Sequence, residues 1–261
     1  MNKQSDGVGW SARAALMAAA LVLAGCAVGP DRRDPFENFN RKVSDFNESV
    51  DAVVLKPAAT VYREALPPLV RTGVSNFFGN LSDAWSFVNS ALQLKGQNAA
   101  ENWMRLNVNT IFGLGGILDV ASELGIERHR EDFGQTLGSW GVPTGPYLVL
   151  PLLGPSTVRD TFALPVDNLG DPVAAVDPAG WRNSLYGLRV VNVRSNLLRA
   201  SSVLEEAALD RYSFTRDAYL QRRRAEVQEG EPRSENDGSD AEGTEMARTP
   251  VNRPWLRLMG R

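Results

Sequence analysis

The chain has 261 residues, with 28 Lys and Arg against 31 Asp and Glu, and a formal net charge of −3. This balance does not predict a basic face, so we do not expect nucleic-acid binding. A single cysteine excludes an intramolecular disulfide.

Residues 1–25 have the pattern of a secretory signal peptide. Lys3 and Arg13 precede an apolar run, and small residues come just before Cys26. The letters LAGC at 23–26 resemble the bacterial lipobox, which implies cleavage before Cys26 and lipidation of that cysteine. Ala27 in the following position implies sorting to the outer membrane, and residues 26–33 would form a short tether. The alternative is an ordinary secretory signal with a chance cysteine.

A first amphipathic helix is expected from residue 34, with Asp34 as N-cap, Pro35 in the first turn and Glu37 reaching back. Apolar residues follow at three- and four-residue spacing and form one stripe. A helix this close to a lipid anchor would lie in the membrane interface. It would equally pack on a domain core, and spacing alone does not separate the two. The stripe consists of Phe36, Phe39, Val43, Phe46, Val50 and Val53.

More helices are expected along the first half of the chain. Residues 57–65 form a short helical piece closed by Pro67 and Pro68. Residues 69–94 continue as helix, with breaks near Gly73 and Gly79. Asn98 and Glu101 then suggest another helix start, and that helix should end at the glycine-rich residues 113–116. These glycines match no phosphate-binding motif and indicate a turn, with a short helix over 116–124.

The polar residues 128–132 include His129, the only histidine. Without cysteine or a second histidine it makes a poor zinc site, and no serine lies in the motif of a hydrolase nucleophile. We therefore expect a solvated or salt-bridged surface histidine. The sequence predicts no catalytic residue, no metal site and no cofactor.

Residues 133–160 are the most unusual stretch. From Phe133 to Val158 there is no charged side chain, yet glycine or proline recurs every few residues. Proline removes backbone donors, so neither a continuous helix nor a membrane-spanning helix fits. Clean strand alternation is also missing. We expect a loop or irregular hairpin with its turn at residues 141–146, either a packed core loop or, in an anchored protein, a segment at membrane depth.

The second half should contain a short helix over 156–162, a turn-rich stretch over 165–178 and interrupted helix from Trp181 to about Arg224. Residues 226–245 hold eight acidic residues and one arginine, which predicts disorder. The division is therefore 1–25 signal, 26–33 tether, 34–225 helical domain and 226–261 acidic tail with an apolar terminus.

Five separated segments resemble the MlaA/VacJ family of outer-membrane lipoproteins, and the resemblance covers about residues 34–224. They are DPFENFNR at 34–41, GVSNFFGN at 73–80, NVNTIFGLGG at 107–116, DFGQTLG at 132–138 and GVPTGPYLVLPLLGPSTVRD at 141–160.

The resemblance implies an all-α, disc-like bundle in the inner leaflet of the outer membrane, enclosing an amphipathic channel. Family members remove mislocalised phospholipids from the outer leaflet and pass them to the periplasmic carrier MlaC, and several associate with trimeric porins. Irregular backbone at membrane depth is tolerated where it lines a wet cavity, which makes the glycine- and proline-rich segment a channel wall or gate. The lipid channel or gate is assigned to Gly141, Pro143, Gly145, Pro146, Tyr147, Phe39, Phe46 and Asn47.

Two other functions compete with lipid transport. A lipid-tethered peptidoglycan lyase would need a carboxyl group of raised pKa, with Glu101 or Glu131 as general acid. A structural lipoprotein bracing an outer-membrane assembly would need no lipid pathway.

Overall fold

The computed structural model describes residues 33–228, and these are mostly helical. The first half contains α2 (Glu37–Val50), the π-helical turn η1 (Asp51–Leu55), α3 (Lys56–Ala65), α4 (Pro68–Leu92), α5 (Gly96–Ile111) and α6 (Val120–Glu123). The second half contains α7 (Phe133–Ser139), β1 (Tyr147–Leu150), β2 (Gly154–Thr157), α8 (Val158–Gly170), the 3-10 turn η2 (Pro172–Ala175), α9 (Ala179–Ala207) and α10 (Arg211–Gln228). The predicted signal, tether and acidic tail lie outside the described residues, except for Arg33 and residues 226–228.

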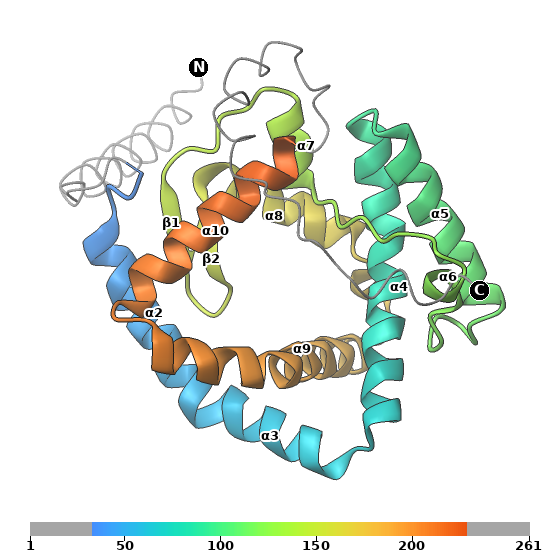
Figure 1. Cartoon of the computed structure of the whole chain (residues 1–261), viewed down its shortest axis with the longest axis horizontal. Helices are drawn as coiled ribbons and strands as arrows, with labels where there is room; N and C mark the ends of the chain where they lie inside the picture. The colour runs from blue at the N-terminus through green and yellow to red at the C-terminus, as the bar shows by residue number, and fades with distance from the viewer. Residues whose placement is uncertain (1–32, 229–261) are drawn as a thin grey trace, which may run out of the picture. The chain divides into compact units, whose positions relative to one another are not determined.

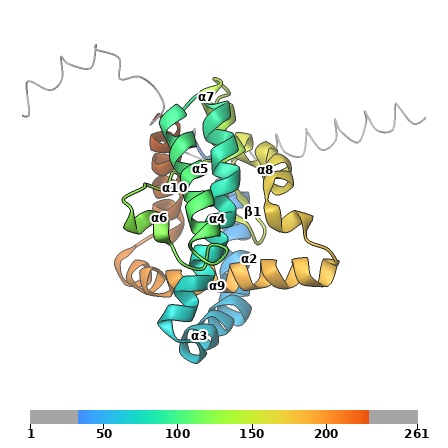
Figure 2. The same cartoon turned by 90° about the vertical axis from the view of Figure 1, so that its right-hand side faces the viewer.

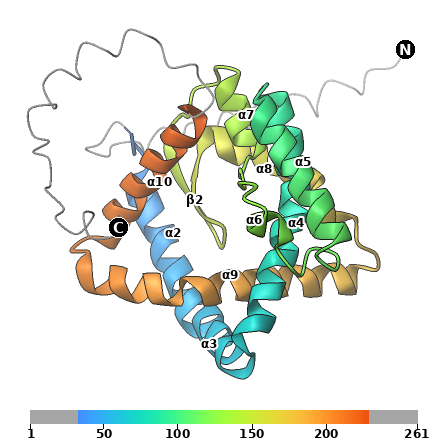
Figure 3. The same cartoon turned by 45° about the vertical axis from the view of Figure 1, so that its right-hand side comes forward.

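The helices of residues 33–228 are arranged around a β-hairpin. Helix α3 packs on α9, α4 on α5 and α7 on α8. In Figure 1 helix α10 passes in front of the hairpin; β1 contacts α2 and β2 contacts α10. In Figure 3 the hairpin turn points toward α9. Figure 2 shows α4 and α5 side by side along their lengths.

The start of α2 differs from the expected capping pattern. Phe36 is the N-cap residue and makes no side-chain capping bond. Asp34 is instead fully buried, and accepts hydrogen bonds from Asn40 and from the Tyr212 hydroxyl. The Asp-Pro sequence therefore marks a buried polar contact and not the helix cap, because the carboxylate has stronger partners elsewhere in the fold.

Helix α4 runs without the predicted breaks. Glycine lowers the stability of a solvated helix, which is why breaks were expected near Gly73 and Gly79. A Cβ added at Gly79 would lie 2.7 Å from the Arg128 guanidinium. The glycine keeps room for that side chain, and the packing it permits outweighs its low helix propensity.

The segment 133–160 contains more regular structure than expected. Its first seven residues form α7, capped by the Asp132 side chain, which accepts from the Gln135 amide at 2.8 Å. The hairpin is antiparallel, with Tyr147 opposite Thr157 and Leu150 opposite Gly154. Its turn lies at residues 151–153, so the prediction of a turn at 141–146 is wrong. Residues 141–146 connect α7 to β1.

The second half also shows longer helices than predicted. Helix α8 begins after Thr157, whose hydroxyl accepts from the Asp160 amide, and passes through Pro165 into the stretch expected to be turns. The long helical pattern is confirmed as α9 and α10, separated at residues 208–210. Helix α10 extends to Gln228, so its last residues belong to the folded part and not to the expected tail.

The polarity of residues 33–228 is inverted relative to a water-soluble fold. Buried polar and charged side chains outnumber buried apolar ones among them. The small apolar cluster consists of Tyr147, Val149, Tyr212 and Leu220. Helices α4 and α5 bury polar residues on their inner faces: Asn80, Asp83, Ser86, Asn89, Ser90, Asn102, Arg105 and Asn109. None of the described helices is long and apolar enough to cross a membrane.

Candidate functional site

A cavity of about 260 Å³ lies beside the hairpin, and charged side chains form part of its lining. Its walls come from α2, the two strands, α9 and α10. The lining residues are Ser44, Asn47, Glu48, Asp51, Tyr147, Val149, Gly154, Pro155, Arg194, Leu197, Ser201, Arg211, Tyr212 and Thr215.

Two asparagines of α2 hold the free edge of β1. The Asn40 amide donates to the Tyr147 carbonyl at 3.0 Å, and its carbonyl accepts from the Val149 amide at 2.9 Å. Asn47 repeats the arrangement, donating to the Leu150 carbonyl and accepting from the Leu152 amide at 2.9 and 2.7 Å. Seven residues make about two helical turns, so both side chains leave the same face. They satisfy backbone groups that an edge strand otherwise exposes.

Ion pairs also line the cavity. Arg194 of α9 makes two bonds to the Asp51 carboxylate, at 2.6 and 2.7 Å, and donates to Ser201. Arg211 of α10 lies 3.4 Å from Glu48. The cavity therefore presents two cations and two carboxylates in fixed positions, and such a surface can exchange contacts with a charged or zwitterionic group.

Tyr147 connects this cavity to the apolar cluster. Its ring is 1% exposed and makes edge contacts with the rings of Tyr212 and Tyr219 at about 6 Å. Burial, with the nearby Asp34 charge, raises the pKa of Tyr147. The hydroxyl therefore stays protonated and neutral throughout the physiological pH range.

The structure brings only two of the predicted channel residues to the cavity, Asn47 and Tyr147. Phe39 and Phe46 are half exposed on the outer surface of α2. The other four residues lie between α7 and β1, where the Pro146 carbonyl accepts from the Val158 amide at 3.0 Å. They are Gly141, Pro143, Gly145 and Pro146.

Sequence reasoning missed the charged residues of the cavity. Glu48 and Asp51 lie off the apolar stripe of the first helix, and the spacing does not show which face of that helix is buried. Arg194 and Arg211 received no assignment. The available signal was the arginine at 194 among the apolar residues of the long helix, since a charge there calls for a partner.

The comparisons with known proteins agree with this geometry. The model of the family described as "MlaA lipoprotein" matches residues 32–226. The intermembrane phospholipid transport system lipoproteins MlaA of Shigella flexneri and Escherichia coli are 36% and 35% identical, over 80% of this chain and 85% of each relative. A solved structure described as "Structural basis for maintenance of bacterial outer membrane lipid asymmetry" aligns with a TM-score of 0.67 at 33% identity, over 75% of this chain and 100% of that one. The chain belongs to the MlaA lipoprotein family.

Proposed function

We propose that this protein removes mislocalised phospholipids from the outer leaflet of the outer membrane and passes them to the periplasmic carrier MlaC. Relatives at about 35% identity are named as intermembrane phospholipid transport lipoproteins, and the similar solved structure concerns outer-membrane lipid asymmetry. The residues of this chain support the same role through their polarity and through the cavity beside the hairpin.

The inverted polarity is the observation that carries the proposal. On α5 and just after it, three apolar side chains are exposed: Trp103 by 50%, Ile111 by 67% and Phe112 by 69%. The polar residues Asn102, Arg105 and Asn109 of the same helix are buried. Exposed apolar area of this extent marks a binding or membrane surface. In this proposal the protein sits in one leaflet, with these apolar side chains against acyl chains. Phe39 and Phe46 would then contact lipid rather than line the passage.

The cavity gives a headgroup a path that avoids hydrocarbon. Moving a charged headgroup through acyl chains is costly unless polar partners accompany it. The carboxylates of Glu48 and Asp51 and the two arginines supply such partners, while acyl chains remain in the surrounding lipid. Tyr147 of the hairpin and Asn47 of α2, which bonds to the hairpin backbone, form one side of this passage. Residues 141–146 connect the hairpin to α7.

The anchor and the protein partners complete the proposal. Lipidated Cys26, outside the described residues, would hold the chain to the periplasmic leaflet of the outer membrane. Direction would come from handover to MlaC, since we assign no chemical conversion to the chain. A trimeric porin is a further partner in this scheme. The lyase alternative loses support because hydrogen bonds from Gln97 and His129 lower the pKa of Glu101, whereas a general acid needs it raised.

Filling the cavity tests the proposal. Ser44 lines it from α2, whereas Ser49 is exposed on the same helix and lies outside the lining. In a strain that lacks the native protein, Ser44→Trp should fail to restore normal outer-leaflet phospholipid content by mass spectrometry. Ser49→Trp should restore it. Both variants must reach the membrane at equal levels, and full restoration by Ser44→Trp would exclude this cavity as the passage.

A further inference from the structure

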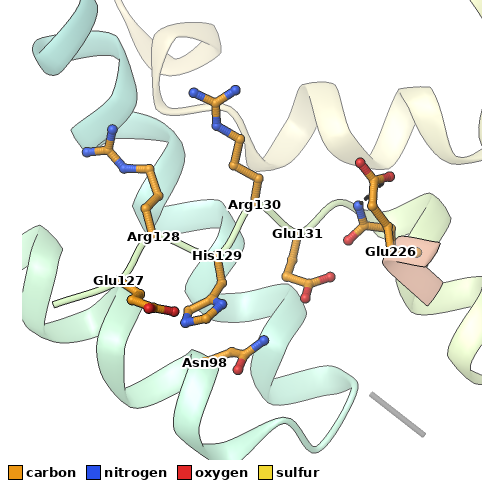
Figure 4. A pocket seen from close by; sticks show the side chains of 8 residues that line it. Asn98, Glu127, Arg128, His129, Arg130, Glu131 and Glu226 are labelled. Atoms are coloured by element: carbon orange, nitrogen blue, oxygen red, sulfur yellow. Dashed lines mark hydrogen bonds between the residues drawn. The ribbon is translucent and has the colours of Figure 1, made fainter. Parts of the chain in front are cut away.

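In residues 127–131, the segment before α7, the acidic and basic side chains point to opposite sides of the backbone. Figure 4 shows Glu127, His129 and Glu131 pointing to one side of the backbone, and Arg128 and Arg130 to the other. Alternation of this kind follows from extended backbone, where successive side chains face opposite ways. Arg128 is engaged on its own side with Asp83 at 2.9 Å. The side with the histidine therefore carries carboxylates without a neighbouring arginine from this segment.

A side chain of helix α5 holds the backbone of this segment in place. Asn102, which is fully buried, donates to the His129 carbonyl at 2.9 Å and accepts from the His129 amide at 3.2 Å. These two bonds place the imidazole beside Glu101, the residue before Asn102 in the helix. His129 Nε2 lies 2.6 Å from Glu101 Oε2. The other oxygen of Glu101 accepts from the Gln97 amide at 2.9 Å, which orients the carboxylate.

Glu127 completes a group of three potential ligands. One ligand atom each from Glu101, Glu127 and His129 lies within 4.8 Å of the other two. Glu127 and His129 open onto a polar cavity of about 690 Å³, which Arg128 and Arg130 also line. The nearby carboxylate of Glu131 is already paired with Lys95 at 2.8 Å.

The same cavity contains a polar atom that lacks a partner. Gln135 is 3% exposed and lines the cavity; its amide nitrogen donates to Glu226 at 3.2 Å. Its carbonyl oxygen has no hydrogen-bond partner among the described residues. Buried oxygen atoms are rarely left this way, so this wall of the cavity lacks one hydrogen-bond donor.

We propose that Glu101, Glu127 and His129 form a Zn²⁺ site that ties the segment to α5. Tetrahedral zinc with bonds of about 2.0–2.1 Å needs ligand atoms about 3.3 Å apart, so Glu101 and His129 move apart slightly and Glu127 moves inward. An imidazole ligand favours zinc over magnesium or calcium, which prefer oxygen ligands alone. Water takes the fourth position and reaches the polar cavity. The expectation of a poor zinc site considered only cysteine and histidine partners, and the fold supplies carboxylates from α5.

The test uses the full mature lipoprotein in detergent, purified without a polyhistidine tag because the chain itself has one histidine. After removal of metal with a chelator, ZnCl₂ is titrated by calorimetry and retained metal is counted by mass spectrometry. We expect one Zn²⁺ per chain, and a visible absorption band when Co²⁺ replaces it. His129→Ala should weaken zinc binding at least about 100-fold, and Glu127→Gln at least about tenfold.

The controls separate ligand loss from misfolding. Glu127 is exposed, so Glu127→Gln should keep its helical circular dichroism. Glu64→Gln makes the same change at an exposed position of α3 and should bind zinc as the unmodified protein does. No binding by the unmodified protein, or binding that survives both His129→Ala and Glu127→Gln, would overturn the proposal. The measurement does not depend on lipid transport.

Discussion

At the scale of single residues, buried asparagines replace backbone partners. Asn40 satisfies the Tyr147 carbonyl and the Val149 amide and also donates to Asp34 at 2.8 Å. Asn40→Ala leaves two buried backbone groups of β1 unpaired, so we expect a loss of about 2–4 kcal/mol in unfolding free energy. Denaturant unfolding followed by circular dichroism measures it. Asn38→Ala, at an exposed position of α2, should change stability by less than about 0.5 kcal/mol. Equal losses in both variants would contradict this role.

The ion pair between Arg105 and Asp119 predicts acid sensitivity. Arg105 is 1% exposed and Nη2 lies 2.7 and 2.9 Å from the two carboxylate oxygens. Although burial acts to raise it, hydrogen bonds from Ser122 and Asn109 and the Arg105 charge hold the pKa of Asp119 at about 2.

The folded pKa of Asp119 lies below the unfolded value of about 3.9, which fixes the sign of the pH effect. The stabilisation is complete above about pH 4 and is lost as the pH falls toward 2. Asp119→Asn should lower stability at neutral pH by about 3–5 kcal/mol, because Arg105 stays buried, and should flatten the decline below pH 4. Melting temperatures from pH 6 to pH 3 check this. Asp45→Asn, on the exposed part of α2, should leave the profile unchanged, and a profile unaltered by Asp119→Asn would count against the pair.

At the scale of elements, the connection formed by residues 141–146 depends on two glycines with positive φ angles. Gly141 has φ +87° and Gly145 has φ +70°. A Cβ on Gly145 would lie 3.1 Å from Val158 Cβ, whereas one on Gly141 would meet nothing within 4 Å. We expect Gly141→Ala to cost about 1–2 kcal/mol from its φ alone, and Gly145→Ala to cost more. Thermal unfolding of the two variants compares them directly.

Neither glycine substitution is a good test of transport, because each would change the backbone strain and any movement of residues 141–146 at the same time. A conclusion about the passage therefore needs a variant at a residue of ordinary backbone conformation, such as Ser44→Trp in α2. Equal stability of the two alanine variants would show that Val158 yields easily and that the connection is looser than its geometry indicates.

Helices α3, α4 and α9 could be predicted because periodicity and prolines report local structure. Two features could not be predicted in the same way. The apolar stripe identifies the apolar face of α2 but not what that face contacts. A face against acyl chains and a face against a protein core have the same spacing of apolar residues. The cavity also depends on contacts such as Arg194 with Asp51, which are 143 residues apart in the chain. The family resemblance identified the transport role, but only the fold identified the charges.

At the scale of the whole chain, the proposed location in one leaflet predicts an apolar environment around residues 33–228. The described surface includes an apolar groove of about 500 Å³ between α4, Ile117, Leu118 and α9. The exposed apolar residues extend well beyond that groove, over α2, α5 and the residues after α5. One partner protein in contact with all of these surfaces would have to enclose the helices, whereas acyl chains do so without specific complementarity.

Tryptophan fluorescence distinguishes lipid from a protein partner. Trp103 is 50% exposed on α5, whereas Trp85 of α4 is partly buried and donates to Asp167 at 2.8 Å. In chains that keep one of these tryptophans and carry Phe at the other five positions, brominated acyl chains should quench Trp103 strongly and Trp85 weakly. Quenching requires contact with the brominated chain, so it reports what lies against each ring. No quenching at Trp103 would mean that protein covers α5, and the one-leaflet arrangement would then fail at the helix where the inverted polarity is clearest. Equally strong quenching at both positions would mean that lipid contact does not follow the exposure of the side chains, which also contradicts this arrangement.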